Sequence, residues 1–234
     1  YSSETSETYL LTVKPFVEEI NTKKGNYSIF IKEVPKNLEK ISYTKLIEDF
    51  EILRNFYIET DIGLWYNTYN HFDSICNLQK DKIKPNMNAL DFYKIVAPIV
   101  AYTKEGHSNI RISDNIDAYK KQNGKYLPFF VKIINKKVYL LNDFDNLKTK
   151  GLVVTKINGN SIDTILDKFL SIEPSDGFNT TSKYDWIEKS FSKYYLYFFE
   201  AEPKAFNIEL INPKTNKKIV YNSVPSINYK KAGV

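Results

Sequence analysis

The residue with the clearest capacity for chemistry is His107, in the segment Lys104-Glu-Gly-His-Ser108. An imidazole titrates close to neutral pH, so it can take a proton from a serine hydroxyl and return it to a leaving amine. That role requires a second group that holds the imidazole in one tautomer. A histidine after a helix-ending glycine can instead cap the last carbonyls of the helix. A catalytic and a structural role for His107 therefore both stay open.

Cysteine and histidine content excludes several other kinds of site. The single Cys76 forms no internal disulfide and cannot anchor a zinc ribbon, an iron–sulfur cluster or a CxxC motif. We expect Cys76 to be a small core residue. The two histidines, His71 and His107, are separated by a presumed helix and no HExxH motif joins them, which argues against a histidine-rich metal site. The sequence therefore predicts no metal and no cofactor.

The charge pattern argues against a nucleic-acid partner. The net charge of +5 is carried by lysine, because only Arg54 and Arg111 among the 33 basic residues are arginine. Recognition of base edges and bidentate phosphate contacts rely on arginine, and the lysines are spread evenly along the chain. No apolar stretch approaches the roughly 20 residues that a membrane-spanning helix needs. We expect neither a nucleic-acid partner nor a membrane-spanning segment.

The elements that must position His107 begin with helices. A length of 234 residues suits two domains, and apolar residues recur at helical spacing from about 43 to 106. Leu46, Phe50, Leu53 and Tyr57 follow i, i+4, i+7 and i+11, which is one stripe of an amphipathic helix. A second helix is expected over 72–82.

A third helix leads directly to the histidine. Asn88 is a candidate N-cap with Asp91 at N3, and Gly106 is a candidate stop for this helix. Pro98 lies inside the run and is expected to kink or break it.

The second half of the chain is predicted to form short strands and two helices. The aromatic run 194–199 indicates a buried helix rather than a sugar-stacking or lipid-facing surface. The expected elements are strands 127–134 and 137–141 with a turn at Asn135-Lys136, strand 152–157, a helix capped by Ser161, a helix over 183–199, and strands 205–211 and 217–222 joined by a turn over 212–216. One further strand is possible at 27–32.

Four segments of the chain resemble parts of a known family. Residues 151–162, Gly-Leu-Val-Val-Thr-Lys-Ile-Asn-Gly-Asn-Ser-Ile, are similar to the strand, Ile-Asn-Gly turn and helix start of PDZ-like domains. Upstream, three segments resemble the helical region of serine peptidases of the C-terminal-processing and tricorn-core type. They are Ile62-Gly-Leu-Trp-Tyr66, Leu90-Asp-Phe-Tyr93 and Lys104-Glu-Gly-His-Ser108. The Asp176-Gly177 segment and the aromatic helix follow in the same order. The family usually has Asp-Gly-His-Thr where this chain has Glu105-Gly106-His107-Ser108.

The resemblance implies roles for particular residues. His107 would be the general base, and Gly106 would allow the turn that directs it toward the active site. The PDZ-like half implies capture of an extended polypeptide or a protein C-terminus by a free strand edge and a backbone nest. The implied receiving residues, in a glycine turn followed by an apolar strand, are Gly124, Lys125, Tyr126, Leu127 and Phe129. An ordinary edge strand is the alternative, and Pro128 suits either.

The family also implies a domain that this chain does not contain. In such peptidases the nucleophilic serine lies in a later α/β domain, and no Gly-x-Ser-x-Gly motif occurs here. The chain is therefore expected to be the front part of a larger enzyme and to be inactive alone. The closing residues Tyr229-Lys-Lys-Ala-Gly-Val234 resemble a sequence introduced by recombination cloning.

Together these observations predict an α+β protein. A helical domain (43–115) precedes a small PDZ-like domain of short strands and two helices (116–225), with an N-terminal segment (1–42) and a tail (226–234) on either side. The expected function is the substrate-binding, base-supplying front of a bacterial serine endopeptidase of the secreted type, in the periplasm or cell envelope, acting with a catalytic domain in cis. The alternative is a stand-alone cell-envelope module that binds proteins or peptides without enzymatic activity.

Overall fold

In the first part of the computed structural model, three helices share one hydrophobic core. The structure describes residues 39–60, 64–199 and 204–232, and the strand expected at 27–32 lies outside them. The described chain begins with helix α1 (Tyr43–Thr60), the short helix η1 (Leu64–Tyr66), α2 (Tyr69–Lys80) and α3 (Ala89–Tyr102). Leu46, Phe50 and Tyr57 are buried, so the predicted stripe on α1 is confirmed, and Cys76 lies in the same core.

Helix α3 begins as predicted and continues through its proline. The side chain of Asn88 accepts the backbone N–H of Asp91 at 3.0 Å, and a carboxylate oxygen of Asp91 accepts the backbone N–H of Asn88 at 3.1 Å. Pro98 lies inside the helix without ending it. The helix ends at Tyr102, four residues before Gly106, because Thr103 caps it and Lys104 takes a positive φ of 59°.

The second part of the described chain is an antiparallel sheet with helices packed against it. Helix α4 (Asp114–Asn123) leads into the hairpin of β1 (Val131–Ile134) and β2 (Lys137–Leu140). The chain continues with strands β3 (Val153–Ile157) and β4 (Asn160–Ser161) and with helices α5 (Ile162–Leu170) and α6 (Thr181–Phe198). It ends with strands β5 (Ala205–Ile211) and β6 (Lys218–Pro225) and helix α7 (Tyr229–Ala232). The strand order is β1-β2-β3-β5-β6, with β4 paired to β3. This arrangement confirms the predicted α+β class with helices before the sheet.

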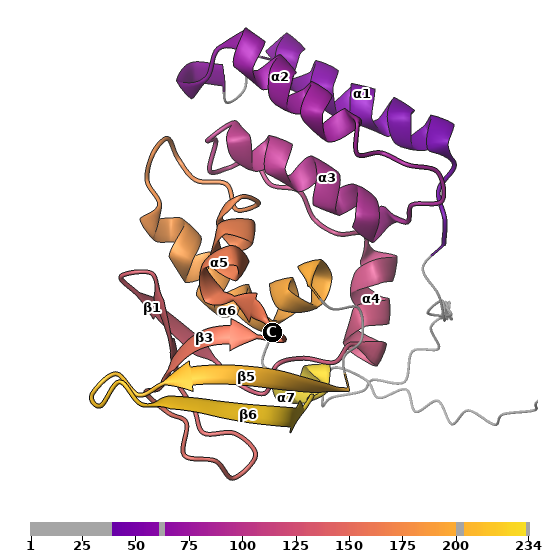
Figure 1. Cartoon of the computed structure of the whole chain (residues 1–234). Helices are drawn as coiled ribbons and strands as arrows, with labels where there is room; N and C mark the ends of the chain where they lie inside the picture. The colour runs from indigo at the N-terminus through magenta and orange to yellow at the C-terminus, as the bar shows by residue number, and fades with distance from the viewer. Residues whose placement is uncertain (1–38, 61–63, 200–203, 233–234) are drawn as a thin grey trace, which may run out of the picture. The chain divides into compact units, whose positions relative to one another are not determined.

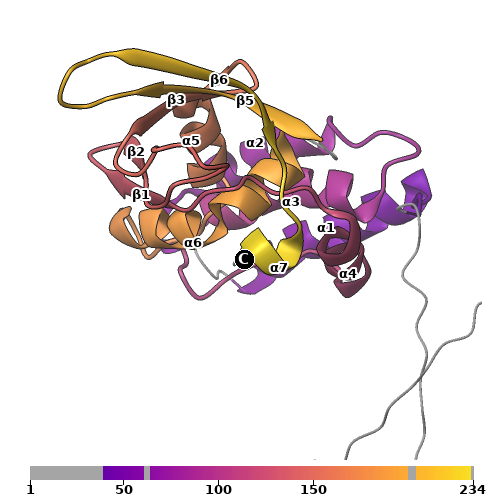
Figure 2. The same cartoon turned by 90° about the horizontal axis from the view of Figure 1, so that it is seen from below.

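Three hydrophobic cores hold the helices and the sheet together. One core joins the sheet to α5 and α6, which Figures 1 and 2 show against the strands, and a second joins α1, α2 and α3. A third core lies between them, where Tyr93 of α3 and Ile116 of α4 meet Leu196 of α6. The described residues all belong to one compact unit, Val34–Val234. The third core therefore fixes the helices that precede His107 against the sheet part that follows it.

The predicted turns and caps of the sheet part are present, but helices α4 and α7 were not predicted. Asn135 and Lys136 both have positive φ in the β1–β2 turn, and the Ser161 side chain accepts the backbone N–H of Thr164 at 3.1 Å. The polar stretch before β1 forms α4, for which no helix was predicted because its apolar residues are few. No helix in the described part of the chain is long and apolar enough to cross a bilayer.

Candidate functional site

The loop that carries His107 is held by hydrogen bonds from both of its ends. After α3, the Thr103 hydroxyl donates to the Val100 carbonyl at 2.7 Å and fixes the helix terminus. One carboxylate oxygen of Glu105 accepts the backbone N–H of His107 at 3.1 Å. Ser108 hydrogen-bonds the buried hydroxyl of Tyr57, whose pKa is raised mainly by burial. The loop is therefore tied to α1 as well as to α3.

The same loop meets the Asp176-Gly177 segment, which lies between α5 and α6. The backbone N–H of Gly106 donates to the Asp176 carboxylate at 2.9 Å, and the backbone N–H of Gly177 donates to the Lys104 carbonyl at 2.9 Å. A Cβ at Gly106 would lie 2.6 Å from an Asp176 carboxylate oxygen and 3.0 Å from its backbone nitrogen. A side chain at position 106 would press against Asp176, so glycine allows this close approach. The structure thus joins two motifs that stand 70 residues apart in the sequence.

His107 and two carboxylates form one cluster at this junction. Potential ligand atoms of Glu105, His107 and Asp176 lie within 4.8 Å of one another, with His107 and Asp176 exposed and Glu105 half-buried. A carboxylate beside an imidazole can hold it in one tautomer and stabilise its protonated form. The cluster therefore has the parts of a general base and its orienting group. Among the described residues it is also the set that could hold a metal ion.

A cavity of about 560 Å³ opens beside this cluster, and Gly106 forms part of its wall. It lies between α3, the segment 106–114, α4, the segment 172–174 and α6. Its volume is in the range of small-ligand sites. The lining includes four aromatic side chains and five charged ones: Tyr93, Trp186, Tyr194 and Tyr197, with Arg111, Asp114, Asp117, Glu173 and Lys193.

Glu173 is the most buried of the charged residues in this cavity, at 7% exposed. The Tyr194 hydroxyl donates a hydrogen bond to its carboxylate. Burial raises the pKa of Glu173, and the Tyr194 hydrogen bond offsets this only in part. Burial and the negative charge of Glu173 together raise the pKa of Tyr194. No described cation forms a salt bridge with Glu173, so a buried carboxylate faces the cavity with a tyrosine hydroxyl as its partner.

A second carboxylate that lines the cavity, that of Asp117, is paired with lysines. Asp117 forms ion pairs with the amines of Lys121 at 2.7 Å and Lys193 at 3.6 Å. Burial raises the pKa of Asp117, but these two lysines outweigh it and the net shift is downward. Arg111 is exposed and has no ion pair with any carboxylate of the described chain. The cavity thus offers an aromatic wall, one free guanidinium and one buried carboxylate.

The raised pKa of Glu173 predicts a pH dependence of stability. Because the folded protein binds this proton more tightly than the unfolded chain, the free energy of unfolding falls as pH rises from the ordinary glutamate value of about 4.3 through the raised pKa. Glu173→Gln cannot ionise, so we expect it to lose this decrease and to exceed the wild type in stability at neutral pH. Urea unfolding near pH 4 and near pH 8 measures both effects. The exposed Glu48→Gln is the control, and an unchanged pH dependence in Glu173→Gln contradicts the assignment.

The proposed peptide-receiving segment has a different environment from the histidine cluster. Gly124 follows α4 and is buried, Lys125 is exposed, and the side chains of Tyr126, Leu127 and Phe129 are at most 3% exposed. The backbone of Tyr126 exchanges two hydrogen bonds with Ile227, at 2.8 and 3.0 Å. Of the strand expected at 127–134, only Val131–Ile134 forms a strand, which is β1.

Several backbone N–H groups of this segment and of β1 already have partners within the chain. The backbone N–H of Leu127 donates to the Ser192 hydroxyl at 2.8 Å. On β1, the backbone N–H of Ile133 donates to the Glu188 carboxylate at 2.7 Å. A peptide that added to this edge would have to displace these partners. Capture of a carboxylate by Gly124–Phe129 stays a prediction.

Sequence reasoning identified the histidine loop but missed the cavity. Arg111, Glu173 and Tyr194 come from three separate segments, and no local pattern connects them. One available signal was Arg111, because one of only two arginines in a lysine-rich chain stands four residues after His107.

Comparisons with known proteins add no assignment. No protein-family model matches the chain, and a search of curated proteins gave no match.

Proposed function

We propose that this chain is the polypeptide-binding front of a serine peptidase, and that His107 is the general base for a serine carried on another domain. The observation that supports this proposal is the cluster of Glu105, His107 and Asp176, held at the point where the helical part meets the Asp176-Gly177 segment. Both motifs belong to the resemblance drawn from the sequence.

In this mechanism the imidazole of His107 takes the proton of the serine hydroxyl as the hydroxyl attacks the scissile carbonyl. It then donates that proton to the leaving amine. Glu105 or Asp176 holds the ring in the tautomer whose free nitrogen faces the serine. The serine and the oxyanion hole come from the other domain. The present chain by itself is expected to hydrolyse no peptide bond.

The cavity beside Gly106 is the proposed binding site for part of the substrate polypeptide. Its tyrosine and tryptophan rings offer apolar surface, and Arg111 and Glu173 offer groups of both charges to a bound chain. It lies next to the histidine loop, so a polypeptide bound there passes close to the proposed base. In line with the family resemblance, we propose that the protein acts outside the cytoplasm.

The second candidate function is a stand-alone peptide-binding module of the cell envelope that uses residues 124–129. The two backbone hydrogen bonds between Tyr126 and Ile227 count against it, because they occupy the edge that a peptide needs. The cavity is therefore the preferred site.

The experiment that tests the cavity as the polypeptide site fills it with a larger side chain. Ser190 lines it from α6, so Ser190→Trp is expected to weaken binding of an unfolded polypeptide at least tenfold. Reduced, carboxymethylated α-lactalbumin is the probe, and isothermal titration calorimetry of the 234-residue chain measures the affinity. The control is Ser182→Trp, an exposed position about two turns earlier on the same helix.

Two results would count against the cavity as the polypeptide site. One is wild-type affinity in Ser190→Trp. The other is a wild-type chain that binds no unfolded polypeptide. If binding survives Ser190→Trp and becomes tighter when Ile227 is replaced by proline, the second candidate function is supported instead, because proline removes the N–H that occupies the Tyr126 carbonyl.

A further inference from the structure

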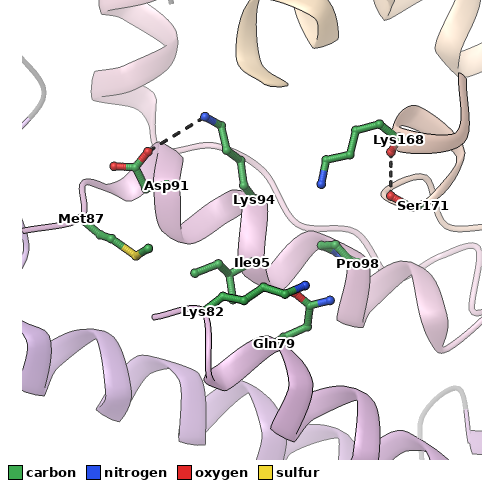
Figure 3. Close-up of a pocket in the computed structure, with 9 residues that line it drawn as sticks. All are labelled: Gln79, Lys82, Met87, Asp91, Lys94, Ile95, Pro98, Lys168 and Ser171. Atoms are coloured by element: carbon green, nitrogen blue, oxygen red, sulfur yellow. Dashed lines mark hydrogen bonds and ion pairs between the residues drawn. The ribbon is translucent and has the colours of Figure 1, made fainter. Parts of the chain in front are cut away.

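A second cavity, away from the histidine loop, collects lysine side chains from three separate segments. It has a volume of about 540 Å³ and lies between the end of α2, α3 and α5. Lys82 comes from the loop after α2, Lys94 from α3 and Lys168 from α5. Figure 3 shows Lys168 extending from α5 into the space that faces α3. The other lining residues are Gln79, Met87, Asp91, Ile95, Pro98 and Ser171.

The positive charge in this cavity is not balanced by its own lining. Asp91 is the one carboxylate among the lining residues, and it lies 4.0 Å from the Lys94 amine. The other oxygen of Asp91 accepts the backbone N–H of Asn88 in the cap of α3. Because this cap holds the Asp91 side chain, the carboxylate cannot move across the cavity to Lys168.

The other two amines have only neutral partners among the described residues. Lys82 donates to the side-chain oxygen of Gln79 at 3.1 Å. Lys168 lies 5.0 Å from the Phe198 ring centroid and makes no ion pair with a described carboxylate. Burial, together with repulsion from Lys82 and Lys94, lowers the pKa of Lys168, and burial lowers that of Lys94. The charges of Lys82 and Lys94 therefore disfavour the protonated Lys168 amine in the absence of an anion.

We propose that this cavity binds a small phosphate-bearing anion, with Lys82, Lys94 and Lys168 as its charge partners. A tetrahedral phosphate presents several acceptor oxygens, so lysine amines from three segments that line one cavity can each donate to a different one. The amide nitrogen of Gln79 is a further donor, because Lys82 occupies only the amide oxygen. Phosphate here replaces repulsion among cations with attraction. This site is independent of the proposed peptidase role, since it shares none of the residues around His107.

The proposal predicts opposite effects of one substitution with and without the anion. Lys168→Met keeps an apolar stem against Phe198 and removes the charge. Without phosphate, the variant is expected to unfold at the same or a higher temperature than the wild type, because repulsion and buried charge are removed. With phosphate, the wild type gains thermal stability and the variant gains little. A lysine with only a structural role would instead lower the unfolding temperature of Lys168→Met in both conditions.

The experiment titrates the 234-residue chain with sodium phosphate, against sodium chloride at matched ionic strength, and follows thermal unfolding and calorimetric heat. The dissociation constant for phosphate is expected to be at least tenfold weaker in Lys168→Met and in Lys94→Met than in the wild type. Lys214→Met, at the exposed β5–β6 turn, is the control and should bind as the wild type does. Glycerol 2-phosphate is the second ligand, and tighter binding of it than of phosphate assigns the site to phosphomonoesters rather than to free phosphate.

Several outcomes would overturn the proposal. Equal stabilisation by chloride would mean that salt only screens the lysines. Unchanged phosphate affinity in both Lys168→Met and Lys94→Met would exclude this cavity as the site. If either variant fails to fold, the exposed Lys82→Met provides the same comparison, because its side chain is not packed in the core.

Discussion

Gly124→Ala is expected to lower the free energy of unfolding by about 2–3 kcal/mol, as overpacking at a buried position does. Gly124 has φ −62° and ψ 144°, which any residue can adopt, so its cost is steric. A Cβ there would overlap the Lys120 carbonyl oxygen and lie 2.8 Å from the Tyr126 ring and 2.9 Å from Leu196. The gain of about 0.4–1 kcal/mol from a stiffer unfolded chain is too small to offset this overlap. Urea unfolding followed by circular dichroism measures the difference.

The neighbouring Lys125→Ala provides the comparison for this measurement. Lys125 is exposed, so its replacement should stay within about 0.5 kcal/mol of the wild type. A Gly124→Ala variant as stable as the wild type would mean that the Gly124 backbone has room that the structure does not give it.

His107→Ala is expected to reduce kcat/KM for a polypeptide substrate by about 10²- to 10⁴-fold, which is the range for loss of a general base. The assay uses the polypeptide that joins this chain to the proposed serine-bearing domain. The effect should fall mainly on kcat, because His107 is proposed to act in the chemical step rather than in substrate binding. His71→Ala is the matched control, since His71 is exposed on α2 and is the other histidine of the chain.

The two carboxylates beside His107 should have smaller effects than the histidine itself. Glu105→Gln and Asp176→Asn keep the hydrogen bonds to the backbone N–H groups of His107 and Gly106 while removing the charge. The one that orients the imidazole should lower kcat and change the pH profile. If neither does, His107 does not depend on its carboxylate neighbours and the orienting role is wrong.

Elements with strong local signals could be predicted from the sequence. The apolar stripe of α1, the Asn88–Asp91 cap of α3 and the Ser161 cap of α5 all depend on residues within a few positions of one another. The Asn135-Lys136 turn likewise follows from the tolerance of asparagine for positive φ. These signals were sufficient for the α+β class and for most element positions.

Features that depend on distant contacts could not be predicted. Helix α4 has few apolar residues, and it forms where Ile116 and Tyr119 reach the core. The early end of α3 depends on Lys104, whose carbonyl accepts the backbone N–H of Gly177. Pairing of Tyr126 with Ile227 joins positions about a hundred residues apart, so the apparent free edge could not be recognised as occupied.

The candidate site likewise contains features that could be predicted from the sequence and features that could not. The sequence indicated His107 and both motifs around it through a resemblance in order and spacing. It could not indicate that Asp176 lies against Gly106, because that contact requires the third core to hold α3 near α6. Nor could it indicate the two cavities, whose charged residues come from segments that meet only in the folded chain.

Chemical rescue of His107→Ala tests the general-base assignment most directly. In the polypeptide that joins this chain to the proposed serine-bearing domain, added imidazole should restore part of the lost turnover in His107→Ala and leave the wild type unchanged. Imidazole can occupy the space of the missing ring and accept the serine proton. Wild-type turnover in His107→Ala without imidazole would contradict the proposal that His107 is the base.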